Sequence, residues 1–261
     1  MATAFRSRDN SPTFPCASGA HIGESAAFEF IQPAESGLLP SMSALPPPEP
    51  LPLVHQHLPE LTGAQLEQLG RLTALLRVYN EKVNLISRKD VEHLEEHHLL
   101  HCLAATRVLR LAAGARVADV GSGGGLPGLP LAILYPQAHF TLVDSVAKKG
   151  RVVAEIAEAL GLANVHIVTA RAEKLRERFD YVLGRAVASL PEFVGWTAGL
   201  LRAGRKGEPA NGILYFKGTL WREELAAHTL RPLTVWDLHT LVPRPYFAEK
   251  YLLHFPAPVR L

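Results

Sequence analysis

The sequence of 261 residues predicts an α/β fold in which a doubly wound, mainly parallel sheet of seven strands follows an N-terminal helical cap. After residue 113, short runs rich in β-branched residues alternate with longer runs of helical periodicity, a pattern typical of a parallel sheet covered by helices on both faces. Residues 61–108 show helical spacing without strand-like runs. A turn crowded with glycine follows the first strand-like run, and it predicts a ligand site at the carboxyl ends of the strands.

The N-terminal part of the chain differs from the rest in composition. Ten of the 20 prolines fall within residues 1–60, and proline supplies no backbone N–H to a helix or a sheet ladder. We therefore expect residues 1–55 to be a disordered, proline-rich extension. Met42 is the only internal methionine and lies just before the proline run at 46–52. We hypothesise that translation begins at Met42 rather than at Met1.

Residues 56–112 predict the helical cap. Thr62 is a suitable N-cap, and the apolar residues from Leu66 to Tyr79 recur at helical spacing, so a helix is expected there. A second helix is expected from Asp90 to about Val108.

Residues 113–261 predict the sheet domain. Its expected strands are 116–120, 139–143, 165–169, 181–183, 213–216, 234–238 and 251–255, with helices at 129–134, 147–160, 190–201 and 220–227. No helical run separates the last two strands, so we expect the last strand to be antiparallel.

Composition and charge narrow the class of protein. No apolar run reaches the roughly 18 to 20 residues that a membrane helix needs. Cys16 and Cys102 form neither a disulfide framework nor a metal quartet, which indicates a reducing cytoplasm. Residues 1–60 hold 2 basic and 6 acidic side chains, whereas residues 61–261 hold 25 basic and 19 acidic ones. The basic excess of the globular part favours a polyanionic partner such as nucleic acid.

The segment 117–130, VADVGSGGGLPGLP, is the clearest ligand signature in the chain. Gly121 and Gly123 can adopt positive φ and let a ligand lie against the main chain, and the helix that follows offers unpaired N–H groups. The dinucleotide fingerprint requires glycine where Leu126 stands, so the spacing argues against a nicotinamide cofactor. The pattern D-x-G-x-G-x-G, which begins at Asp119, resembles motif I of methyltransferases that use S-adenosyl-L-methionine (SAM).

Polar residues follow the next three expected strands. Asp144 could accept hydrogen bonds from ribose hydroxyls, cap the following helix, or do both. The N–H of Ala172 and the carboxylate of Glu173 could contact an adenine or simply begin a helix. Arg185 is a site candidate because burying an arginine requires a partner.

A closer resemblance is carried by five motifs. They are YNEKVNLIS at 79–87, HLL at 98–100, DVGSGGGLPGLP at 119–130, DS at 144–145 and GRA at 184–186. Together they resemble the bacterial RsmG family, also called GidB, over residues 61–256. The resemblance implies a Rossmann-like class I SAM-dependent methyltransferase that methylates N7 of a guanine in 16S ribosomal RNA. The chain departs from the family at His101 and Cys102, where an aspartate and a serine are usual.

The site expected from the residues and the resemblance has two parts. The SAM-binding residues are Gly121, Gly123, Leu126, Asp144, Ala172, Glu173 and Arg185. Ribosomal RNA phosphates are expected to contact Lys148, Lys149 and Arg151, with Arg88, Lys89 and Lys217 as weaker candidates. Guanine N7 has a free lone pair and carries no proton, so no general base is expected and no catalytic residue is assigned.

Other chemistries and functions are less favoured. His93, His97 and His101 have the spacing of metal ligands on a helix, but no fourth ligand accompanies them and we expect no metal. Cys102 has no neighbour in sequence that would lower its pKa, so we do not expect a nucleophile. We expect a cytoplasmic monomer that acts on 16S ribosomal RNA or the small subunit, without a membrane partner. The alternatives are a SAM methyltransferase of a small molecule and a non-catalytic RNA-binding or ribosome-assembly protein.

Overall fold

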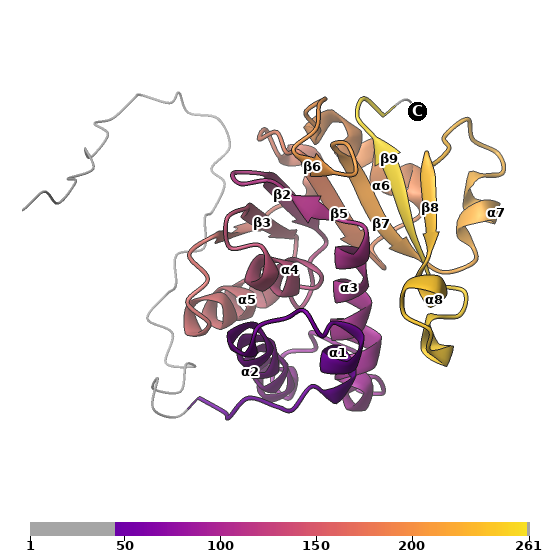
Figure 1. Cartoon of the computed structure of the whole chain (residues 1–261). Coiled ribbons are helices and arrows are strands. Elements are labelled where there is room, and N and C mark those ends of the chain that lie inside the picture. Colours follow the sequence, from indigo (N-terminus) through magenta and orange to yellow (C-terminus); the bar gives the residue numbers. More distant parts are fainter. Residues whose placement is uncertain (1–44, 260–261) are drawn as a thin grey trace, which may run out of the picture.

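The computed structural model describes residues 45–259 of the chain (Figure 1). The expectations for residues 1–44, including a start at Met42, lie outside the described residues. Within residues 45–259 no helix is long and apolar enough to cross a membrane.

A seven-stranded sheet forms the centre of the molecule, as expected. Its order is β4-β3-β2-β5-β7-β9-β8, and β9 runs antiparallel to both of its neighbours. The strands are β2 (Arg116–Val120), β3 (His139–Asp144), β4 (Val165–Thr169), β5 (Tyr181–Arg185), β7 (Gly212–Lys217), β8 (Thr234–Asp237) and β9 (Tyr251–Pro256). A small antiparallel pair, β1 (Arg110–Leu111) with β6 (Gly207–Glu208), was not expected from the sequence.

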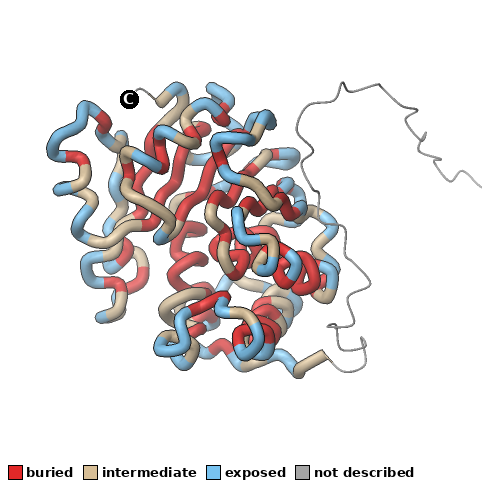
Figure 2. The backbone as a smooth tube through the Cα atoms, turned by 180° about the vertical axis from the view of Figure 1, so that it is seen from behind, coloured by how far each residue is buried: buried red, intermediate tan, exposed pale blue. Residues whose placement is uncertain are grey.

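Both faces of the sheet are apolar, because alternate residues of each strand point into different cores. On β2, Val117 packs in one core and Ala118 in the other. The first core takes side chains from α2 (Gly63–Asn80), α4 (Gly128–Leu134) and α5 (Ala147–Ala159). The second takes them from α6 (Leu190–Thr197) and α7 (Trp221–Leu225). The inner strands are accordingly buried along most of their length (Figure 2).

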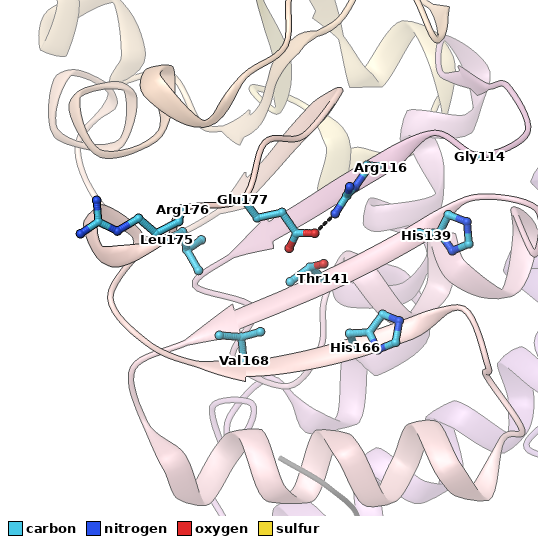
Figure 3. A pocket seen from close by; sticks show the side chains of 9 residues that line it. All are labelled: Gly114, Arg116, His139, Thr141, His166, Val168, Leu175, Arg176 and Glu177. Carbon is cyan, nitrogen blue, oxygen red and sulfur yellow. Dashed lines mark ion pairs between the residues drawn. The ribbon is translucent and has the colours of Figure 1, made fainter. Parts of the chain in front are cut away.

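One part of the second face has no helix over it. The connection from β4 to β5 contains only a 3-10 turn, Ala172–Lys174, so the outer half of the sheet is covered incompletely. A hollow of about 820 Å³ lies there, lined by side chains such as Arg116, His139 and His166 (Figure 3). Arg116 forms an ion pair with Glu177 across it. This hollow runs along the sheet face from the amino ends of the strands, at Arg116 and His139, as far as Val168 near the end of β4.

The cap helices follow the sequence prediction in part. Thr62 caps α2 and exchanges hydrogen bonds with Gln65 in a capping box. The second expected helix, 90–108, is a composite of 3-10 turns, the π-helix Leu94–Leu100 and the short α-helix α3 (His101–Leu103). A short α8 (Leu238–Leu241) follows β8 and was not expected.

The prediction of disorder is wrong for residues 45–55. Pro52 begins the helix α1 (Pro52–His57). A helix tolerates proline at its first position, because the N–H of that residue would have no partner within the helix. Glu95 accepts the N–H groups of the next two residues at 2.7 and 3.0 Å, so it replaces the missing cap. Glu49 forms an ion pair with Arg77 at 2.9 Å, and its N–H donates to the carbonyl of Gly70. Tertiary contacts therefore order a run whose composition alone indicates disorder.

The contact between residues 45–51 and α2 predicts the effect of one substitution. A Cβ at Gly70 would lie 2.3 Å from the carbonyl oxygen of Glu49, so Gly70→Ala must push the two segments apart. We expect the free energy of unfolding, measured by urea denaturation, to fall by about 1 to 3 kcal/mol. Gly63→Ala in the same helix is the control, because a Cβ there meets nothing within 4 Å. Equal stability of the two variants would contradict the packing of residues 45–51 on α2.

Candidate functional site

The glycine loop joins β2 to α4 and is built around left-handed backbone conformations. Gly121 and Gly123 have φ of +73° and +55°, a region that other residues rarely adopt. A Cβ at Gly121 would also lie 2.7 Å from the side chain of Val187. The N–H groups of Gly121 and Ser122 both donate to the carbonyl of Val143 on the neighbouring strand, at 2.8 and 3.1 Å. The loop therefore turns tightly over the carboxyl ends of β2 and β3.

Asp119 ties the end of β2 to the start of α4. Its carboxyl group is almost completely buried, and its Oδ2 accepts the N–H of Gly128, the first residue of α4, at 2.7 Å. Burial raises the pKa of Asp119 to about 7, against the lowering effects of this hydrogen bond and of the charge of Arg185. A side chain at position 128 would collide with the same oxygen, since a Cβ there would lie 2.8 Å from it. The acid and the last glycine of the motif are thus one structural unit.

Asp144 ends β3 and acts on both sides of the turn. Its Oδ2 accepts the N–H of Gly123 at 2.8 Å, and its Oδ1 accepts the N–H of Val146 at 2.8 Å, directly before α5. The capping role considered from the sequence is not found, because Val146 is the N-cap residue of α5 and no side chain caps this helix. The two hydrogen bonds leave lone pairs free on both oxygens, so a ribose could be bound by this half-buried carboxylate.

Beside Asp144 lies a cavity of about 430 Å³, a volume that suits a nucleoside. We call it the nucleoside cavity. Of the expected SAM-binding residues, it brings together Gly121, Asp144, Ala172 and Glu173. Its apolar walls include Val187 and Trp196, which were not anticipated. Val187 directly follows the GRA motif at 184–186, and Trp196 lies outside the motifs. The remaining lining residues are Val120, Val143, Ser145, Ala170 and Arg171. The donor set, acids and main-chain groups between apolar walls, fits the hydroxyls and the purine of an adenosine.

Three of the expected SAM-binding residues do not line this cavity. Gly123 contributes its N–H to Asp144 instead. Leu126 is buried in the first core, and its N–H donates to the carbonyl of Ser122. Arg185 lies at the carboxyl end of β5, level with the glycine loop on the adjacent strand. Next to it, Ala186 has a φ of +55°, an unfavourable conformation for alanine that is typical of functional sites.

The side chain of Arg185 points away from the nucleoside cavity and toward the cap. Its Nη2 lies 3.0 Å from Nδ1 of His98, and its Nη1 lies 3.4 Å from the carbonyl oxygen of His97. Nε2 of His98 and Nδ1 of His97 lie 2.5 and 2.6 Å from the two carboxylate oxygens of Asp90. Burial lowers the pKa of His98 to about 4, and the charge of Arg185 adds to this effect, so the imidazole is neutral at pH 7.

The histidine spacing does not produce a metal site in this part of the chain. Among residues 45–259, no group of three side chains is placed to hold a metal ion. The π-helix changes the phase of the helix, so His97 binds Asp90 while His101 is buried against Phe216 and Phe247. Burial raises the pKa of Cys102 to about 11, so its thiol is protonated at pH 7.

The basic residues expected to contact RNA divide into two groups. Lys148 and Arg151 are exposed and Lys149 is half-buried near the start of α5, directly after Asp144. Lys217 is instead engaged within the fold, since its Nζ lies 2.7 Å from Glu224. Arg88 and Lys89 are exposed near the start of the cap's second helical segment.

Comparison with known proteins decides the family. A family model described as GidB, rRNA small subunit methyltransferase G, matches residues 65–239. The chain belongs to this family. The resemblance to RsmG and the fold class expected from the sequence are therefore confirmed.

Named relatives are similar over most of the chain. A protein of Flavobacterium johnsoniae named ribosomal RNA small subunit methyltransferase G is 41% identical over 201 residues, covering 77% of this chain and 95% of its own. A relative of the same name from Flavobacterium psychrophilum is 40% identical over 206 residues, covering 79% and 98%. Among solved structures, a precorrin-6y C5,15-methyltransferase of Geobacter metallireducens matches 59% of this chain and 76% of its own, with 16% identity and a TM-score of 0.42.

The raised pKa of Asp119 predicts how stability depends on pH. The pKa is near 7 in the folded state and about 4 in an unfolded chain. Asp119 therefore favours the folded state fully below pH 4, and this contribution is lost as the pH rises through 7. Asp119→Asn keeps an oxygen for the N–H of Gly128 but cannot ionise. We expect the melting temperature of the variant, relative to the original chain, to increase from pH 5 to pH 7.5 and then to level off. The difference in free energy of unfolding between the variant and the original chain should reach at most about 4 kcal/mol. If this difference does not change with pH, the pKa of Asp119 is not raised in the folded state.

Proposed function

We propose that this chain transfers the methyl group of SAM to N7 of a guanine in 16S ribosomal RNA. The observation that carries the proposal is the position of the nucleoside cavity. It lies beside a glycine loop whose acid and glycines have the motif I spacing, in a chain that belongs to the GidB family.

Residues of the cavity would hold the adenosine part of SAM. The carboxylate of Asp144 would accept hydrogen bonds from the ribose hydroxyls, as acids at this strand position do in doubly wound folds. The N–H of Ala172 and the carboxylate of Glu173 would contact the adenine edge between the apolar walls. SAM supplies an electrophilic methyl group on a sulfonium. The glycine loop would let its methionyl part pass close to the main chain, toward β5.

The side chains near Arg185 fit a reaction that needs no proton transfer. Guanine N7 attacks with its own lone pair and carries no proton, so no general base has to remove a proton. His98 is neutral and already bonded at both ring nitrogens, and the thiol of Cys102 is buried and protonated at pH 7. Catalysis then rests on holding N7, the methyl carbon and the sulfur in line, an effect worth up to roughly 7 to 11 kcal/mol.

The exposed cations of α5 would orient the RNA. Lys148, Lys149 and Arg151 follow Asp144 directly, so phosphates bound there would lie at the carboxyl edge of the sheet, where the methyl group is presented. A ribosomal RNA substrate would place the protein in the cytoplasm.

A backbone substitution tests the function in cells. Gly121→Ala should abolish the N7-methylguanine that this chain forms, because a Cβ at φ +73° is strained and lies 2.7 Å from Val187. A strain that lacks the gene would be complemented with the original chain or with the variant, and N7-methylguanine in 16S RNA would be mapped by mass spectrometry. Gly161→Ala is the matched control, because its φ is +67° but a Cβ there meets nothing within 4 Å.

The outcome separates the proposed function from its alternatives. Loss of one N7-methylguanine with Gly121→Ala, and its return with Gly161→Ala, supports the proposal. An unchanged 16S methylation pattern with altered small-subunit profiles would favour a non-catalytic assembly protein. An unchanged pattern with normal subunits would favour a small-molecule methyltransferase.

If the basic residues at the start of α5 bind RNA, their removal should change how strongly RNA binding depends on salt. Replacing Lys148 and Lys149 by alanine should weaken binding of 16S RNA and reduce the slope of log K against log salt by about 1 to 2, because fewer counterions are released. Filter binding at several salt concentrations measures the slope. The control replaces Arg205 and Lys206, which are exposed near β6 at the opposite ends of the strands. The same slope in both double variants would refute the assignment of α5 to the RNA interface.

A further inference from the structure

Arg185 has an unusual set of partners for an arginine that is half-buried. Its guanidinium contacts a neutral imidazole and a main-chain carbonyl, and within residues 45–259 it forms no ion pair with a carboxylate. These two contacts use two of the five N–H donors of the guanidinium. Its positive charge is therefore not neutralised by a direct contact, and other donors remain for a ligand.

The contact with Arg185 determines which nitrogen of His98 carries a proton. A guanidinium can only donate, so Nδ1 of His98 must accept. Nε2 then carries the hydrogen and donates to the carboxylate of Asp90 at 2.5 Å. Asp90, His98 and Arg185 thus form one directed chain from the cap to the end of β5. We call these three residues the Asp90 relay.

The relay is held from two further sides, by His97 of the cap and by Tyr246 of the sheet domain. His97 bonds the second oxygen of Asp90 at 2.6 Å, and its ring stacks on Tyr246 with the centroids 3.9 Å apart. The hydroxyl of Tyr246 donates to the same His97 carbonyl that faces Arg185. Although burial raises the pKa of Asp90, the two histidine hydrogen bonds outweigh it and the pKa is lowered. Asp90 is therefore ionised at pH 7 and fixed at both oxygens.

The position of Arg185 indicates what its free donors meet. The nucleoside cavity is lined from the ends of β3 and β4, from Gly121 and, beyond β5, from Val187 and Trp196. Arg185 ends β5 and directs its side chain to the other face of the sheet, toward the cap. A SAM molecule whose adenosine fills the cavity must extend its methionyl part across the loop toward β5. The α-carboxylate is the anionic group of that part, and an arginine fork suits a carboxylate.

We propose that Asp90 and His98 are positioning residues that hold the guanidinium of Arg185 for the α-carboxylate of the methyl donor. The inference rests on the proposed use of SAM, and not on the identity of the methyl acceptor. Asp90 and His98 do not touch the ligand in this assignment. They direct Arg185, so their loss should affect only the carboxylate-bearing part of the ligand.

Two probes isolate that part. S-adenosylhomocysteine carries the amino-carboxyl group, whereas methylthioadenosine keeps the adenosine and the thioether and lacks it. The affinity of the purified full chain for each is measured by isothermal titration calorimetry. We expect Arg185→Gln to weaken S-adenosylhomocysteine binding about 10- to 100-fold, the loss of a hydrogen bond between charged groups. Methylthioadenosine binding should change less than threefold.

Variants of His98 separate the two ends of the relay. His98→Asn keeps an acceptor near the position of Nδ1, whereas His98→Gln places its amide near Nε2 and leaves Arg185 without that partner. We expect Asp90→Asn and His98→Gln to weaken S-adenosylhomocysteine binding about 5- to 20-fold. His98→Asn keeps the contact with Arg185 and loses the contact with Asp90, so its loss should be smaller than that of His98→Gln, and adding Asp90→Asn to it should cause no further loss. Asp237→Asn is the matched control, since this carboxylate caps α8 and makes no contact in the relay. Melting temperatures of all variants report on folding.

Combining substitutions distinguishes positioning from general damage. If Asp90 acts through Arg185, adding Asp90→Asn to Arg185→Gln should cause no further loss of S-adenosylhomocysteine affinity. Additive losses, equal losses for both probes, or unchanged binding in Asp90→Asn and His98→Gln would each overturn the inference. A chain that binds neither probe would overturn the proposed use of SAM, and the relay with it. Selective loss in a chain that leaves 16S RNA unmodified would support the relay and refute only the acceptor.

Discussion

The hydrogen bond between the buried carboxyl group of Asp119 and the N–H of Gly128 is the contact on which the rest of the site depends. It joins the end of a central strand to the first turn of α4. The loop between these two residues has no freedom to open, so Gly121 and Gly123 must turn with positive φ. Asp144 then receives the N–H of Gly123, and the second strand end is aligned with the first.

The alternation of side chains along the strands divides the ligand site into two halves. The nucleoside cavity uses residues that point to one face of the sheet, such as Val120 and Val143. Arg185 points to the other face, where the cap closes over the first core. In the proposed assignment, a ligand that crosses the glycine loop would be held from both faces.

The cap itself shows how tertiary contacts override local preference. The proline run before α1 is ordered because Glu49 and Leu51 find partners on α2 and in the core, and because Glu95 caps α1 from a distance in sequence. The π-helix costs regular hydrogen bonding, and it lets two successive histidines share the carboxylate of Asp90. Such irregular turns are frequent at functional sites. The cap therefore supplies the polar partners of Arg185 and does not only cover the first core.

Much of this protein follows from its sequence alone. The seven strands, most of the helices between them, the capped helix α2 and the family could be predicted, because period, caps and motif spacing are local properties. The short α8 between the last two strands could not. Gly121, Asp144, Ala172 and Glu173 could be placed in one site, because parallel strands end at the same edge. Only the tertiary structure decided that residues 45–55 are ordered, that the second helix is irregular, and which groups Val187, Trp196 and Asp90 contact. These features depend on contacts between residues that are distant in sequence and meet when the sheet and the cap pack. Local sequence patterns do not predict such contacts.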